Sequence, residues 1–281
     1  MKVGVWGLGS MGLGMAQSLV RAGHEVAGFD PRGVALEGAV DVPPGAMDGA
    51  VVVVLNAAQL ETVVGELAGA LPEGAVVLAC ATVPPDTARA LAERCRAAGL
   101  LYLDAPISGG AAKAAEGRLS IMASGEPAAF ARAEPLLDAM AETVFRLGDA
   151  AGAGSAMKAV NQMLAGTHIA AMAEAMVFGV TQGIDPARFM EVIPRCAGTS
   201  WMLENRGPHV VDADYAPRSA VDIWPKDLGI VAAIAEAAGI EMPVMQAALA
   251  RFREASEAGL GGEDDAAVAK VYARQAGVAL P

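Results

Sequence analysis

Short runs of apolar and β-branched residues recur along the first half of the chain and predict β-strands. The runs cover residues 2–6, 25–29, 50–55, 75–79, 100–103, 119–123 and 143–147. Alanine-rich stretches with helical periodicity separate most of them, as at residues 11–22 and 86–98. This alternation predicts an α/β fold with a doubly wound, mainly parallel sheet that is covered by helices on both faces.

The pattern changes near residue 150, where the strand-like runs stop and long helical patterns begin. Residues 155–183 are predicted to form one long linking helix, apolar around most of its circumference. We expect such a helix to be buried on nearly every side, with the help of a partner subunit. Further helices are predicted at residues 186–196, 200–206, 219–238 and 243–258. The chain therefore divides into an α/β domain at residues 1–150 and an all-α domain at residues 151–281.

A glycine-rich turn follows the first predicted strand and precedes the first predicted helix. Gly7, Gly9 and Gly12 have the spacing G-x-G-x-x-G, which allows a tight turn, close approach to a pyrophosphate and close packing of helix on strand. Asp30 ends the second strand 18 residues after Gly12 (30 − 12), near the roughly 20 expected for the carboxylate that binds the ribose of NAD. We therefore predict a Rossmann-type dinucleotide site, which also includes the intervening residues Leu8, Ser10 and Met11.

Two charged residues bear on the choice of cofactor. The Asp30 carboxylate favours NAD, because it repels the 2′-phosphate of NADP. Arg32 follows two residues later, and its guanidinium could pair with that phosphate if the loop turned it inward. NAD is the prediction, and NADP is the alternative.

Composition excludes several classes of protein. The net charge of −12 over 281 residues lacks the basic surface that a nucleic-acid partner needs. Three cysteines without a Cys-x-x-Cys spacing suit free thiols in a reducing compartment, and the three histidines lack metal-ligand spacing. The most apolar long stretch contains His168 and Glu174, so we expect a buried helix rather than a membrane span. With no signal-peptide pattern at the N-terminus, a cytoplasmic protein is expected, without metal, nucleic acid or membrane.

Two polar segments are candidates for chemistry. Ser108, Gly109 and Gly110 leave a predicted strand end, where a hydroxyl and exposed N–H groups suit a carboxylate, although a plain flexible loop is the alternative. Lys158 lies near the start of the long helix, with Asn161 and Gln162 on the same face. Unless it extends to solvent, such a lysine must face a cleft, where desolvation would lower its pKa and suit it to proton transfer.

Four segments in order resemble the β-hydroxyacid dehydrogenase family, and the resemblance runs along the whole chain. They are GLGSMG at residues 7–12, DAPISGG at 104–110, GAGSAMK at 152–158 and KDL at 226–228. The resemblance implies an NAD(P)-dependent enzyme acting on a CH–OH group, with a Rossmann domain, a long linking helix and an all-α domain that forms a homodimer or homotetramer. It further implies that Lys158 is the general acid/base and that Ser108, Gly109 and Gly110 hold the substrate carboxylate. By the same resemblance, Lys226 lies by the nicotinamide and the substrate, and Asn56 and Thr82 contact the cofactor.

The chain departs from the usual family pattern at Gln162, four residues after the lysine, where most members have asparagine. A glutamine at this position resembles the branch of the family that acts on L-threonate, and so do two other stretches of the substrate-side half, residues 164–176 and 205–229. A four-carbon sugar acid such as L-threonate, or a close polyhydroxy acid, is therefore the predicted substrate, with Asn161 or Gln162 orienting the lysine or a substrate hydroxyl. The alternatives are 3-hydroxyisobutyrate or a related semialdehyde-type substrate and, from another class of protein, a nonenzymatic NAD sensor.

Overall fold

Five of the predicted strands pair in parallel to form one sheet, and the predicted α/β fold is confirmed. The computed structural model describes residues 1–281 and divides them into two units, Met1–Lys158 and Ala159–Pro281. The sheet belongs to the first unit and has the order β2-β1-β3-β4-β5. Its strands are β1 (Lys2–Trp6), β2 (Glu25–Phe29), β3 (Gly49–Val52), β4 (Val76–Ala79) and β5 (Leu101–Asp104). In this order the topological switch point, where ligands of open α/β sheets bind, lies between β1 and β3.

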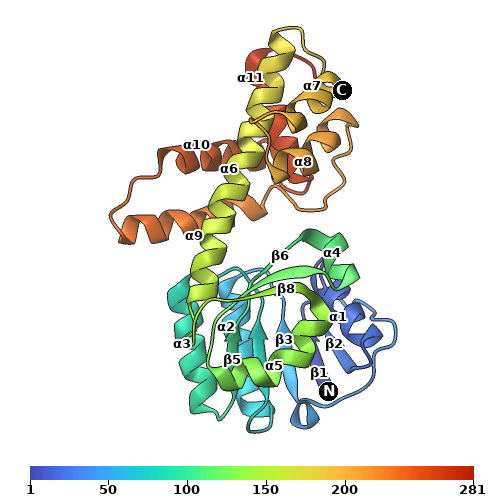
Figure 1. Ribbon diagram of the computed structural model, residues 1–281, viewed down its shortest axis with the longest axis vertical. Coiled ribbons are helices and arrows are strands. Elements are labelled where there is room, and N and C mark those ends of the chain that lie inside the picture. The colour runs from blue at the N-terminus through green and yellow to red at the C-terminus, as the bar shows by residue number, and fades with distance from the viewer. The chain divides into compact units, whose positions relative to one another are not determined.

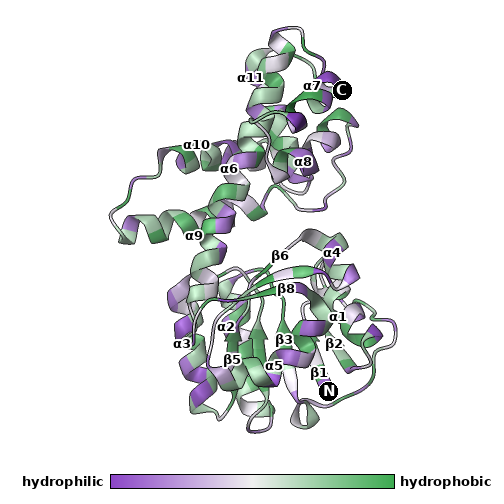
Figure 2. Ribbon diagram, viewed as in Figure 1, coloured by the Kyte–Doolittle hydropathy of each residue, from purple (hydrophilic) through white to green (hydrophobic).

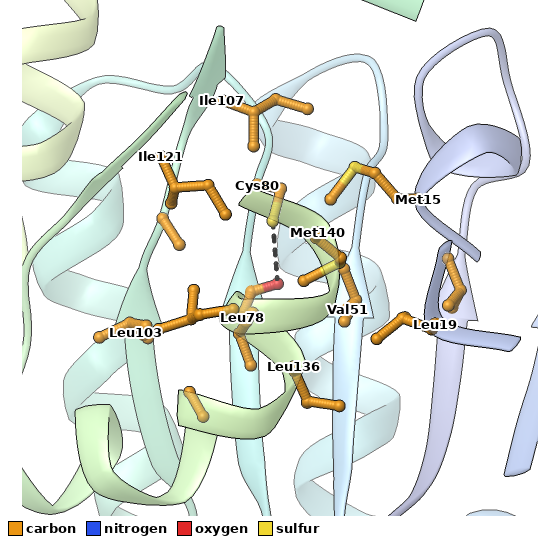
Figure 3. Packing of buried hydrophobic residues seen from close by; sticks show 14 of the residues in the cluster. Met15, Leu19, Val51, Leu78, Cys80, Leu103, Ile107, Ile121, Leu136 and Met140 are labelled. Atoms are coloured by element: carbon orange, nitrogen blue, oxygen red, sulfur yellow. Dashed lines mark hydrogen bonds between the residues drawn. The ribbon is translucent and has the colours of Figure 1, made fainter. Parts of the chain in front are cut away.

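Helices cover both faces of the sheet, as Figure 1 shows. On one face α1 (Gly12–Arg21) and α5 (Pro127–Met140) pack on the strands; on the other lie α2 (Ala57–Ala70) and α3 (Pro85–Ala97). The strands are largely hydrophobic, whereas α3 carries many hydrophilic residues (Figure 2). Figure 3 shows the core under α1 and α5, where side chains such as Met15, Leu78 and Leu136 meet. Burial on both faces explains why these strands lack an alternating polar pattern.

The last two predicted strands do not join this sheet. They form a second, three-stranded sheet in the order β6-β7-β8, made of β6 (Ile107–Ser108), β7 (Leu119–Ala123) and β8 (Ala141–Arg146). The first pair is antiparallel and the second is parallel. A short helix, α4 (Gly110–Glu116), connects β6 to β7 and packs on α1. An isolated bridge between Asp104 and Ser124 joins the ends of β5 and β7.

The second unit is helical. The long helix α6 (Ala153–Thr181) begins in the first unit and continues into the second, as the sequence pattern predicted. It is followed by α7 (Pro186–Val192), α8 (Trp201–Val211), α9 (Ile223–Ala237), α10 (Pro243–Ala255) and α11 (Val268–Ala276). Short 3₁₀ or π turns occur at Pro44–Ala46, Ile193–Arg195, Ser256–Leu260 and Asp265–Ala267.

Helix α6 is long and apolar enough to cross a membrane by length and composition alone. Its residues Ile169, Met172 and Met176 are almost fully buried in the core of the second unit, as expected for a core helix of a globular protein. In the single chain, however, α6 is not buried on every side. Val160, Leu164 and Phe178 are 53%, 46% and 65% exposed, so an apolar stripe of α6 remains uncovered in one chain.

Candidate active site

The glycine-rich turn after β1 has the geometry of a dinucleotide loop. Gly7 has φ +91°, and a Cβ there would lie 2.4 Å from the Val53 carbonyl oxygen. A Cβ on Gly12 would lie 1.9 Å from the Gly7 carbonyl oxygen, so only glycine lets α1 start this close to the strand. At Gly9 the nearest atom to such a Cβ is a guanidinium nitrogen of Arg32, 3.9 Å away, so the protein leaves room for a ligand. These are the three separate glycine roles of a pyrophosphate-binding turn.

Asp30 lies next to this turn, and its carboxylate is fully engaged. It accepts hydrogen bonds from the backbone N–H of Leu8 at 2.8 Å and of Arg32 at 2.9 Å. The Arg32 guanidinium adds two more, Nε to Oδ1 at 2.9 Å and Nη2 to Oδ2 at 3.0 Å. The hydrogen bond from the Arg32 side chain is the main reason why the pKa of Asp30 lies well below its ordinary value. The carboxylate is therefore ionised, and the Arg32 side chain must move if ribose hydroxyls are to replace it.

Two other predicted cofactor residues lie at the same edge of the sheet. Asn56 follows β3 and caps α2, accepting a hydrogen bond from the Gln59 N–H at 3.0 Å. Thr82 follows β4 and is half-buried. Because parallel strands end at one edge, the turn after β1, Asn56 and Thr82 surround the same end of the sheet. Trp6 at the end of β1 stacks on Phe29 at the end of β2, with ring centroids 4.4 Å apart.

The first unit also brings Lys158 to the predicted carboxylate loop. Lys158 is 8% exposed, and its Nζ donates a 2.8 Å hydrogen bond to the carbonyl oxygen of Ile107. Ser108 is the next residue and is half-buried in β6. Gly109 and Gly110 have φ values of +137° and +79°, which a side chain would strain. Lys158 is therefore buried and directed at the loop rather than extended into solvent.

Sequence reasoning missed the role of Asp104, which belongs to the same DAPISGG segment. Its side chain is buried and accepts hydrogen bonds at the start of α6, from the N–H group of Gly152, which directly precedes the helix, and from the N–H group and hydroxyl of Ser155. Ser124 donates a further one. Burial raises the pKa of Asp104, and these hydrogen bonds oppose the rise.

In the second unit, a chain of hydrogen bonds links the predicted polar residues of α6 to those of α9. Gln162 donates from Nε2 to the Asp227 carboxylate at 2.5 Å and accepts at Oε1 from Asn161 Nδ2 at 2.9 Å. Asp227 is also paired with Lys226. Gln162 and Asp227 are 7% and 3% exposed, whereas Asn161 is half-buried and the Lys226 side chain is 26% exposed. Both functional ends of the Gln162 amide are thus occupied by protein groups.

The start of α9 is held by Trp224. Its indole Nε1 donates to Asp265 at 3.0 Å, and Asp265 is also paired with Arg206. The indole lies against Gly166 of α6, where an added Cβ would be 2.8 Å from the ring. It also stacks on Phe252 at 5.5 Å. Pro225 fits this start because it stands in the first turn of the helix, where a backbone N–H has no intrahelical partner to lose.

The described residues contain no cluster of three or more His, Cys, Asp or Glu side chains that could hold a metal ion. The turn after β1, Asp30 and the strand ends instead fit a nicotinamide dinucleotide. The fold and this turn together define a Rossmann-type, dinucleotide-binding protein.

Comparison with known proteins makes the assignment more specific. Residues 2–148 match the family model for the NAD-binding domain of 6-phosphogluconate dehydrogenase. Residues 152–272 match the model described as NAD-binding of NADP-dependent 3-hydroxyisobutyrate dehydrogenase. The chain belongs to the β-hydroxyacid dehydrogenase family, and it is an NAD(P)-dependent hydroxy-acid dehydrogenase.

Individual relatives cover nearly the whole chain. An L-threonate dehydrogenase of Cupriavidus necator is 48% identical, over 99% of this chain and 97% of the relative. A 3-hydroxyisobutyrate dehydrogenase of Pseudomonas aeruginosa is 36% identical, over 95% and 96%. The crystal structure of a 3-hydroxyisobutyrate dehydrogenase from Salmonella typhimurium superimposes with a TM-score of 0.91 at 46% identity, covering 96% of this chain and 99% of that one. These names agree on the class of reaction and differ on the substrate.

Proposed function

We propose that the protein oxidises a small polyhydroxy acid, with Lys158 as the general acid/base. The observation that carries the proposal is the hydrogen bond from Lys158 Nζ to Ile107, which holds the amine next to the Ser108 to Gly110 loop. A general base must lie within hydrogen-bond reach of the proton that it removes. A substrate whose carboxylate is bound by that loop would bring a nearby hydroxyl to the amine.

In the proposed reaction, a bound nicotinamide cofactor would supply the acceptor for the hydride of the hydroxyl-bearing carbon. Lys158, in its neutral form, accepts the hydroxyl proton. The Ser108 hydroxyl and the backbone N–H groups of Gly109 and Gly110 hold the carboxylate. The turn at residues 7–12 would hold the pyrophosphate of that cofactor, and Asp30 would bind its ribose hydroxyls once Arg32 had turned away.

Polar residues that follow Lys158 in the chain are the proposed partners for the rest of the substrate. Asn161 and Gln162 follow Lys158 by three and four residues on α6, so all three side chains lie on one side of the helix. Gln162 is buried and its amide is engaged at both ends, whereas Asn161 and the Lys226 side chain are more exposed, so we assign the contacts with substrate hydroxyls to these two. Several polar groups suit a substrate with several hydroxyls better than one with a methyl branch.

L-Threonate is the proposed substrate, with 3-hydroxyisobutyrate as the second candidate. The relatives named L-threonate dehydrogenase are 43–48% identical to this chain, whereas the curated 3-hydroxyisobutyrate dehydrogenase is 36% identical. Against this stands the Salmonella structure, which is named for the second substrate and is 46% identical. Gln162 in place of the usual asparagine supports the first candidate.

Initial rates of cofactor reduction at 340 nm test the proposal. The panel is L-threonate, D-threonate, 3-hydroxyisobutyrate, glycerate and tartrate, each with NAD and with NADP. We expect the highest kcat/KM for L-threonate with NAD. Activity confined to 3-hydroxyisobutyrate would contradict the choice of substrate and leave the role of Lys158 intact. Cofactor binding without reduction by any of the acids would instead favour an NAD sensor.

We also propose that the protein is a cytoplasmic homo-oligomer, a dimer or a tetramer, with a cofactor domain at residues 1–150 and a substrate and oligomerisation domain at residues 151–281. The support is the apolar stripe of α6, where Val160, Leu164 and Phe178 are exposed in the single chain. A second copy of this chain would cover such a stripe. Light scattering of the wild type and of Phe178→Glu tests this, and a monomeric wild type would contradict it.

A further inference from the structure

The carboxylate of Asp104 ties the end of β5 to the start of α6. Its Oδ2 accepts hydrogen bonds from the backbone N–H groups of Gly152 and Ser155, both at 2.9 Å. Its Oδ1 accepts one from the Ser155 hydroxyl at 2.7 Å. The first N–H groups of a helix have no partner within the helix, and a negative charge is favourable there. Asp104, which is 1% exposed, thus supplies a buried anchor for α6.

Ser124 and two glycines reinforce this anchor. The Ser124 hydroxyl donates to Asp104 at 3.2 Å and accepts from the N–H of Gly154 at 2.9 Å. A Cβ on Gly154 would lie 2.4 Å from the Met122 carbonyl oxygen and 2.8 Å from that of Asp104. Gly152 has φ +107°, which a side chain rarely adopts. The helix therefore starts closer to the strands than any larger residue would permit.

The anchor is joined to Lys158 by two short paths. Along α6, Lys158 lies three residues after Ser155, about 4.5 Å further along the helix axis. Along the other path, Ile107 follows Asp104 by three residues, and its side chain is buried in the core (Figure 3). The hydrogen bond from Lys158 Nζ to the Ile107 carbonyl closes the ring at 2.8 Å. Asp104 thus fixes both the helix that carries the amine and the segment that leads to the Ser108 to Gly110 loop.

We propose that Asp104, acting with Ser155, is a positioning residue that holds the Lys158 amine in register with the carboxylate loop. The inference rests on the proposed role of Lys158 as general acid/base. Neither Asp104 nor Ser155 touches the substrate in this role. A displacement of the reacting groups by about 1 Å can lower a rate by roughly 10²-fold, so a loosened α6 start lowers kcat before it lowers binding.

The test is a double-mutant cycle of Ser155→Ala and Lys158→Ala in the full-length protein. Ser155→Ala removes one hydrogen bond and leaves the two backbone N–H bonds to Asp104. We expect kcat to fall about three- to tenfold, with the KM of the hydroxy acid and the Kd of NAD unchanged. In the Lys158→Ala background the same change should have no further effect on the residual kcat, because the group that Ser155 positions is gone.

Ser256→Ala is the matched control, because the Ser256 hydroxyl also donates to an aspartate, Asp222, in the second unit. It should leave kcat unchanged. Asp104→Asn should lower kcat by roughly 10²-fold where it folds. If Ser155→Ala lowers kcat equally in both backgrounds, or in neither, the positioning role is wrong.

A second measurement needs no turnover. Acetic anhydride labelling of Lys158, followed by peptide mass spectrometry, should be faster in Ser155→Ala than in the wild type or in Ser256→Ala. Unchanged labelling would contradict the proposal. A wild type that oxidises no hydroxy acid, or a Lys158→Ala variant with normal kcat, would instead overturn the proposed function, so the two failures are distinguishable.

Discussion

The two units offer candidate binding groups of different kinds. In the first unit, many of the candidate groups are backbone: the N–H groups of the turn at residues 7–12, the Gly109 and Gly110 loop, and the helix start anchored on Asp104. The side chains of Asp30 and Lys158 lie beside these backbone groups. In the second unit, the candidate groups are side chains on two helices, Asn161 and Gln162 on α6 and Lys226 and Asp227 on α9.

This difference indicates which unit can accept amino-acid substitutions without losing its binding groups. The positions of backbone groups change little when neighbouring side chains are replaced, provided that a few glycines remain. The first unit is therefore suited to binding the cofactor and the carboxylate, which related reactions have in common. A side-chain network can be altered by one substitution, such as glutamine for asparagine at position 162. We therefore expect substrate preference to depend on the second unit.

The largest effect is expected from Lys158→Ala, which removes the proposed general acid/base of the first unit. The kcat for the hydroxy acid should fall by roughly 10²–10⁴-fold, as for other lost general acid/base groups. The Kd of NAD, measured by fluorescence titration, should stay within about twofold, because the turn at residues 7–12 does not involve the lysine. A large loss of cofactor affinity with kcat retained would place Lys158 outside the chemistry.

Two glycine substitutions in the turn at residues 7–12 distinguish an effect on folding from an effect on cofactor binding. Gly12→Ala puts a Cβ 1.9 Å from the Gly7 carbonyl oxygen, so both the Tm and the affinity for NAD should fall. Gly9→Ala meets only the end of Arg32, so the Tm should be unchanged while the Kd of NAD rises about tenfold or more. Equal effects of the two changes on Tm would show that Gly9 is needed for the turn rather than for the ligand.

Gln162→Leu tests the side-chain network of the second unit. It removes both hydrogen bonds of the amide and leaves the buried Asp227 with one donor fewer, a change that costs about 1–3 kcal/mol at a buried site. We expect the KM of L-threonate to rise about tenfold, with the Kd of NAD unchanged, in steady-state and titration measurements. Gln162→Asn is the milder companion. An unchanged ratio of kcat/KM between L-threonate and 3-hydroxyisobutyrate in both variants would argue against this unit as the source of specificity.

The smallest effect is expected at the rim of the cofactor site. Arg32→Ala releases Asp30 from its guanidinium partner and removes a cation that could pair with a 2′-phosphate. We expect the ratio of kcat/KM for NAD over NADP to rise about three- to tenfold. A fall in this ratio would mean that Arg32 supports NAD binding instead of competing with it.

Much of the fold of the first unit could be predicted from the sequence, because the patterns that indicate it lie within short stretches of the chain. The parallel strands are continuous apolar runs, and the turn at residues 7–12 has its glycines at fixed spacing. The second small sheet was not foreseen as a separate sheet. Its strand β6 has two residues, too few for a periodic pattern, and it pairs with residues that follow α4.

The hydrogen bonds between side chains at the candidate site could not be predicted, because they join residues that are far apart in the sequence. Asp104 bonds to residues 48 and 51 positions further along the chain, and Gln162 bonds to Asp227, 65 positions away. Such contacts depend on how helices pack, which local propensity does not encode. The pairing of Arg32 with Asp30 is close in sequence but depends on one side-chain rotamer, so the sequence left both orientations open.

The placement of the tryptophans provides the protein with its own optical probes. Of the three, Trp6 stacks on Phe29 directly before the turn at Gly7, Trp224 is buried two residues before Lys226, and Trp201 is 58% exposed. Emission from Trp6 should respond when a nicotinamide dinucleotide occupies the turn, and emission from Trp224 should respond to changes around Lys226. Replacing Trp201 with phenylalanine would leave one fluorophore in each unit, so that events in the two halves could be followed without an added label.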